Sequence, residues 1–117
     1  MKLQIDRQHL RVRIDEDELA HLLAGASVTA HTQFADAFAL QCVLSLGSPA
    51  IASLTGQPAA WQILLPADAV RELASRLPSR DGLRFELGGA AESDTLTLLF
   101  DVDVRDSARR LKASRKG

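Results

Sequence analysis

The chain has 117 residues, of which 46% are hydrophobic and 25% are charged, and its formal net charge is −1. This length and composition indicate one globular domain and exclude a disordered chain. No apolar run approaches the roughly 20 residues of a membrane helix, and the start of the chain lacks a signal-peptide pattern. We therefore expect a cytoplasmic protein that does not enter a membrane. The lone Cys42 excludes an internal disulfide.

The charges are divided unevenly between the body of the chain and its end. Residues 1–104 contain eight Lys/Arg and 14 Asp/Glu, a net charge of −6. Residues 105–117 contain six Lys/Arg and one Asp, a net charge of +5, and they show no apolar pattern. We therefore expect one α+β domain at 1–104 and a basic, disordered tail at 105–117.

The first half of the chain is predicted to contain strand, strand, helix, strand and strand. Asp15 is the expected N-cap of the helix, and Glu18 three residues later completes a capping box. Leu19, Leu22 and Leu23 form its apolar stripe, and Gly25 is expected to end it. The alternation of apolar and polar residues places the strands at 2–6, 10–14, 28–34 and 38–46.

The second half is predicted to have the same order of elements. Pro66 suits the first turn of a helix, where the missing N–H of proline is not needed, and Pro78 is expected to end that helix. Val70 and Leu73 lie on its apolar stripe. The strands of this half are expected at 51–55, 61–65, 83–87 and 96–104.

The strand-to-helix stretch at 10–23 has a counterpart at 61–74, 51 positions later. In this register Val12 corresponds to Ile63, and both are apolar strand residues. The identity between the halves is low, so a ββαββ duplication and coincidence are both open. Because the strands alternate, we expect mainly antiparallel pairing. The predicted fold is a strongly curved sheet or an eight-strand barrel with two helices.

The resemblance to a known family rests on segments along the whole body: Lys2–Ile5, Leu10–Arg13 with Glu18, Thr32-x-Phe34, Phe38–Leu46, Ile63–Pro66, Asp81–Glu86 and Leu98–Asp103. With them, nearly the whole of the body resembles a family of small uncharacterised bacterial proteins of about this length. No activity is established for that family, so the resemblance implies no catalytic residue and no cofactor. The basic tail is a departure from the family pattern.

Three arginines are candidates for binding an anion such as a nucleotide, polyphosphate or nucleic acid: Arg11, Arg13 and Arg84. They are expected on the polar faces of their strands, where a solvated outer sheet surface is the favoured alternative. A barrel with arginines in its lumen would be similar to the triphosphate tunnel enzymes. Their Glu-x-Glu-x-Lys signature is absent, however, because the corresponding strand has Lys2-x-Gln4-x-Asp6. The tail could add affinity for nucleic acid, but a role in solubility is favoured.

No metal or cofactor site is predicted. His9, His21 and His31 fall in different elements and lack the spacing of metal ligands. Cys42 shares the phase of buried strand residues, where burial would raise the pKa of its thiol. The acidic run at 15–18 is explained by capping of the first helix.

These observations favour a non-catalytic domain that acts through protein–protein contact. The partner is either another protein or a second copy, which could form a homodimer through an exposed strand edge. An anion-binding module that uses Arg11, Arg13 and Arg84 is the alternative.

Overall fold

The structure is a computed structural model of the whole chain, and it describes residues 1–48, 51–79 and 81–104. The expected basic tail at 105–117, with its candidate role toward nucleic acid, lies outside the described residues. The elements of the first half are β1 (Lys2–Asp6), β2 (His9–Asp15), α1 (Glu16–Leu23), β3 (Val28–Phe34) and β4 (Phe38–Gly47). Those of the second half are β5 (Ser53–Gln57), β6 (Ala60–Pro66), α2 (Ala67–Ser75), β7 (Leu83–Leu87), the short 3-10 helix η1 (Glu92–Asp94) and β8 (Leu96–Asp103).

The eight strands form two four-stranded sheets. Sheet A has the order β1-β2-β8-β7, and sheet B has the order β3-β4-β6-β5. Each half of the chain therefore contributes one hairpin to each sheet. The counterparts of β1, β2, β8 and β7 in the other half are β5, β6, β4 and β3. With this replacement, the order of sheet A becomes that of sheet B, read from the β5 edge. The α+β class is confirmed, and most strand pairs are antiparallel.

The central pair of each sheet is parallel, which corrects the expectation of antiparallel pairing there. β2 runs parallel to β8, with Val12 opposite Phe100, and β4 runs parallel to β6, with Leu44 opposite Ile63. Each parallel pair joins strands from different halves of the chain. Alternation reports which face of a strand is buried, but it does not report the direction of the neighbouring strand. A mixed sheet with one solvent-exposed face therefore gives the same sequence pattern as an antiparallel sheet with one solvent-exposed face.

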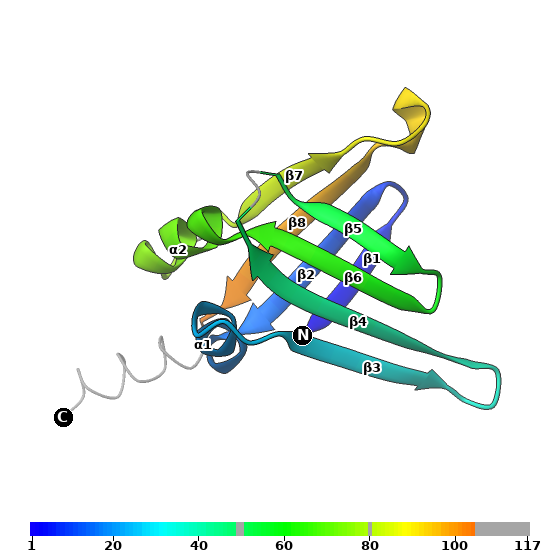
Figure 1. Cartoon of the computed structure of the whole chain (residues 1–117), viewed down its shortest axis with the longest axis horizontal. Helices are drawn as coiled ribbons and strands as arrows, with labels where there is room; N and C mark the ends of the chain where they lie inside the picture. The colour runs from blue at the N-terminus through cyan, green and yellow to red at the C-terminus, as the bar shows by residue number, and fades with distance from the viewer. Residues whose placement is uncertain (49–50, 80, 105–117) are drawn as a thin grey trace.

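The pairing among the described residues gives two sheets and no closed barrel, so the barrel alternative is not found. Each sheet has two edge strands with a partner on one side only, β1 and β7 in sheet A and β3 and β5 in sheet B. Figure 1 shows both helices at one end of the sheets and the hairpin turns at the other end. Within the described part of the chain, neither helix has the length and apolarity needed to cross a bilayer.

The start of α1 agrees with the predicted capping box. The backbone N–H of Glu18 donates to the Asp15 carboxylate at 2.7 Å, and the backbone N–H of Asp15 donates to the Glu18 carboxylate at 3.1 Å. These bonds satisfy N–H groups that have no partner within the helix. Gly25 follows α1 with φ of +94°, a left-handed conformation that glycine adopts at low cost.

One apolar core joins the two sheets and the two helices. Leu22 of α1 and Leu73 of α2 are both 1% exposed and belong to the same cluster, as expected. Every other residue of the central strands points into this core. The buried strand residues are Leu10, Val12, Ile14, Val28, Cys42, Leu44, Ile63, Leu65, Leu98, Phe100 and Val102.

Candidate functional site

Arg11 and Arg13 lie on the face of β2 that points away from the core. Both guanidinium groups contact the carboxylate of Asp101 on β8. Two nitrogens of Arg11 donate to one carboxylate oxygen at 2.5 and 3.1 Å. The Nε of Arg13 lies 3.5 Å from the other oxygen, without a hydrogen bond. The charges of these two arginines are therefore partly balanced within sheet A.

Arg84 lies on the outer face of β7 and has its own carboxylate partner. Its Nε donates to Glu86 at 2.9 Å, and the Thr97 hydroxyl donates to the same carboxylate at 3.0 Å. The hydrogen bond from Arg84 is the main reason that the pKa of Glu86 lies below its ordinary value, and the hydrogen bond from Thr97 is the second. Arg84 is thus oriented by a neighbour two residues along its own strand.

The structure brings Arg11 and Arg84 to the two sides of Leu99. Leu99 of β8 is directly opposite Arg11 on one side and directly opposite Arg84 on the other. The three residues line a hollow of about 430 Å³, which Asp101 also borders. Arg13 lies two residues further along β2 and does not line the hollow, but its guanidinium group contacts Asp101. An anion bound in the hollow would meet two guanidinium groups, but it would compete with Asp101 and Glu86 for them.

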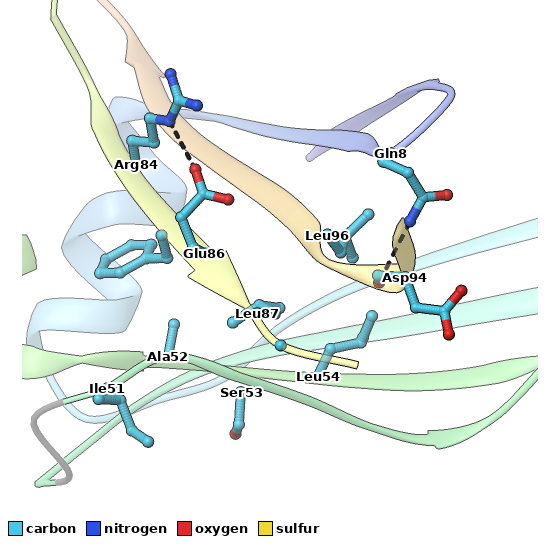
Figure 2. A pocket seen from close by; sticks show the side chains of 12 residues that line it. Gln8, Ile51, Ala52, Ser53, Leu54, Arg84, Glu86, Leu87, Asp94 and Leu96 are labelled. Atoms are coloured by element: carbon cyan, nitrogen blue, oxygen red, sulfur yellow. Dashed lines mark hydrogen bonds and ion pairs between the residues drawn. The ribbon is translucent and has the colours of Figure 1, made fainter. Parts of the chain in front are cut away.

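A larger groove of about 820 Å³ lies between the edge strands β5 and β7 (Figure 2). Leu54, Leu87 and Leu96 provide apolar walls, and the Arg84–Glu86 pair lies on one side. The described residues that line it include no histidine and no cysteine. The groove therefore offers a binding surface of mixed apolar and charged character.

Sheet B differs from sheet A in its charge. From residue 24 to residue 67 the sequence contains one charged residue, Asp36, in a chain with 29 Lys, Arg, Asp and Glu residues. All four strands of sheet B fall within this span. Its outer face carries threonine, glutamine and serine side chains and His31, with half-buried Val43 and Leu64. By contrast, the outer face of sheet A carries charges of both signs from all four strands.

The β3–β4 hairpin continues beyond the rest of sheet B as a two-stranded arm (Figure 1). The pairing of β4 with β6 begins at Gln41, so the preceding residues of the hairpin have no further strand beside them. At the tip, Phe34 and Phe38 are 43% and 61% exposed, and their ring centroids lie 5.0 Å apart. Both rings point to the same side of the hairpin as the core residue Leu44. This apolar side of the hairpin is therefore buried near Leu44 and exposed at the tip.

The histidines and the cysteine of the chain lie on four different elements, β2, α1, β3 and β4. No group of three or more His, Cys, Asp and Glu side chains is arranged to hold a metal ion there. Cys42 is fully buried, and this burial raises the pKa of its thiol, in agreement with the prediction. His9, His21 and His31 are exposed on three different elements.

The sequence placed Arg84 and Glu86 on one strand face, but it did not show that Asp101 lies beside Arg11 and Arg13 or that one whole sheet lacks charge. Asp101 is 90 residues from Arg11 in the chain, so local spacing gives no sign of the pair. The gap in charge from 24 to 67 was visible in the sequence and was the available signal. No family model matches the chain, and no curated protein sequence matches it either.

Proposed function

We propose that the chain is a small, non-catalytic cytoplasmic domain that acts by protein–protein contact and binds its partner through sheet B. The absence of charge from this sheet is the observation that carries the proposal. Depletion of charged residues distinguishes the centre of a protein interface from the rest of a protein surface. The remaining surface of the domain is rich in charged groups, as expected for a face that stays in water.

The energetics of desolvation favour sheet B over sheet A as the contact surface. Burying an ionised group costs several kcal/mol unless a partner charge and hydrogen bonds compensate for it. The outer face of sheet B holds hydroxyl and amide groups, which a partner can satisfy with ordinary hydrogen bonds. Val43 and Leu64 add apolar area on this face, and Phe34 and Phe38 add more at the tip of the arm.

The test places a photo-activated cross-linker on each sheet in the native cell. Gln62, exposed on the outer face of sheet B, is replaced by p-benzoylphenylalanine, and Gln4, exposed on the outer face of sheet A, is the matched control. We expect discrete protein adducts from position 62 and not from position 4. Adducts from position 4 alone, or from neither position, would refute the proposal.

A second candidate function is anion binding in the hollow between Arg11 and Arg84. The favouring observation is that two arginines from separate strands flank one apolar residue, Leu99. Such a site would suit a phosphate attached to an apolar or aromatic group. The internal pairs with Asp101 and Glu86 lower the expected affinity, because each must be weakened before the anion is bound.

Calorimetry with ATP and polyphosphate at low and high salt tests this candidate. Binding that falls with salt and is lost in Arg11→Ala and Arg84→Ala would support it. Arg71→Ala is the control, because Arg71 lies on α2 and pairs with Asp68. The absence of binding at low salt would remove this candidate.

We further propose that the two halves of the chain arose by duplication. The support is that β1, β2, α1, β3 and β4 recur in order as β5, β6, α2, β7 and β8, with the same pairing pattern. The first two strands and the helix match at an offset of 51 residues, as in Val12 and Ile63. Homologous sequences test this idea. If their halves align in this register no better than shuffled sequences do, duplication is refuted.

A further inference from the structure

The four edge strands differ in their protection against pairing with another chain. Natural sheets protect an edge with charged residues, proline, a bulge or short length. β1 carries Lys2 and Asp6, and β7 carries Arg84 and Glu86. β5 has five residues, and one of them is Gly56 at φ +108°.

The edge of β3 has none of these protections. Its sequence is Val-Thr-Ala-His-Thr-Gln-Phe, seven residues without Lys, Arg, Asp, Glu, Pro or Gly. All seven pair with β4 on one side, and no strand of the described chain pairs with them on the other. A row of backbone N–H and C=O groups therefore points outward from an uncharged strand.

We propose that β3 pairs antiparallel with β3 of a second copy of this chain, which joins the two B sheets into one. This inference rests on the proposed function, because β3 belongs to the uncharged sheet, and it names a second copy as the partner at the edge of that sheet. The electrostatics identify that partner. The edges and outer face of sheet A would bring charged side chains, such as Arg84 or Asp101, against an uncharged strand that cannot compensate them. The β5 edge is also uncharged, but it has five residues and includes Gly56, so it offers a shorter and weaker pairing surface than β3. The uncharged β3 edge of a second copy brings no unpaired charge.

The symmetry of such a dimer fixes its register. A twofold axis requires that the same surface be used by both copies. The pairing that includes all seven residues of β3 is centred on His31, so Thr29 lies opposite Gln33 of the second copy and Val28 lies opposite its Phe34. This register places the exposed Phe34 ring beside Val28 of the second copy, at the end of β3 that borders the apolar core.

The size of the seam predicts a dimer that dissociates readily. A seven-residue strand is about 24 Å long, and a sheet with its side chains is about 10 Å thick. The seam then covers roughly 250 Å² per copy, well below the roughly 800 Å² of a standard interface. Edge pairing plus the two Phe34 rings therefore predicts a dissociation constant in the micromolar range or weaker.

Sedimentation velocity of the purified full chain, from about 1 to about 300 µM, tests the inference. We expect a monomer at the lowest concentration and a growing dimer fraction above it. The variant Thr29→Lys/Gln33→Lys places like charges directly opposite each other and is expected to weaken the dimer about tenfold or more. The control is Thr55→Lys/Gln57→Lys, which adds the same charge to the exposed β5 edge and is expected to leave the dimer unchanged. Circular dichroism checks that both variants fold.

A charge-reversal experiment tests the register itself. Mixing Thr29→Lys/Gln33→Lys with Thr29→Glu/Gln33→Glu places opposite charges across the seam, so the mixture is expected to form heterodimers although each variant alone is weakened. In addition, His31→Cys is expected to form a disulfide dimer under mild oxidation, because Cys42 is fully buried and does not compete. A chain that stays monomeric at every concentration, or a β5 control that weakens the dimer equally, would overturn the inference. In the first case, heavier adducts from position 62 in the cell would still support the proposed function with a different partner.

Discussion

Replacing Leu22 or Leu73 by alanine tests whether the two helices share one core. Each residue is 1% exposed, and each occupies the same place in its half of the chain. Removing three buried carbons costs about 2.4 kcal/mol from transfer alone, at about 0.8 kcal/mol per carbon. The cavity that remains raises the expected cost to about 3 kcal/mol for either substitution. This is a large part of the roughly 5–15 kcal/mol by which a typical domain is stable.

Leu23→Ala is the matched control, because Leu23 follows Leu22 in the same helix but is 38% exposed. Its expected cost is about 1 kcal/mol, since water already reaches part of the side chain. Urea unfolding, followed by the fluorescence of Trp61, measures all three variants. With a slope of about 1.5 kcal/mol/M, the buried substitutions should lower the midpoint by about 2 M, and the control by less than about 1 M. Equal shifts for Leu22 and Leu23, or no shift for Leu73, would refute the shared core.

Four further results are expected. Asp15→Ala should lower stability by about 1 kcal/mol in the same unfolding assay, because it removes the cap of α1. Cys42 should react with a thiol reagent only after unfolding, and rapid reaction of the folded protein would contradict its burial and raised pKa. The pKa of Glu86 is lower in the folded chain than in the unfolded one, so its ionised form stabilises the fold above about pH 4.3, and this contribution is lost as the pH falls through the folded value. An NMR titration in which Arg84→Ala fails to raise that midpoint would show that Arg84 is not the main cause of the lowered pKa. Gly56→Ala should destabilise the β5–β6 turn, because its φ is +108° and an added Cβ would clash with the Ala60 carbonyl oxygen; an unchanged melting temperature would count against this.

The local parts of the fold could be predicted because their causes are local. The cap of α1 needs only Asp15 and Glu18, three residues apart, and both expected hydrogen bonds are found. The strands follow from alternation, and the largest difference is at β5, which begins at Ser53 and not at Ile51. The parallel pairs β2–β8 and β4–β6 could not be predicted this way. They depend on the exchange of hairpins between the halves, which no short pattern encodes.

For the candidate surfaces, too, the local features could be predicted from the sequence and the features that depend on strand pairing could not. The sequence could place Arg11 and Arg13 on one wet strand face, because residues two apart in a strand share a face. It could not show that Asp101 lies beside them, since that depends on the pairing of β2 with β8. The scarcity of charge from 24 to 67 can be seen in the sequence. The sequence does not show, however, that this span forms one whole sheet with β3 at its edge.

The division of the strands between the sheets bears on how the protein is made. Sheet B is built from one continuous stretch, Val28 to Pro66, whereas sheet A joins strands from near both ends of the described chain. On the ribosome, the strands of sheet B emerge together, while β2 must wait for β8, which is synthesised about 80 residues later. All strands of the uncharged sheet are thus present in a nascent chain that still lacks β7 and β8 of the other sheet. A chaperone, or a neighbouring nascent chain on the same messenger RNA, would meet this surface first.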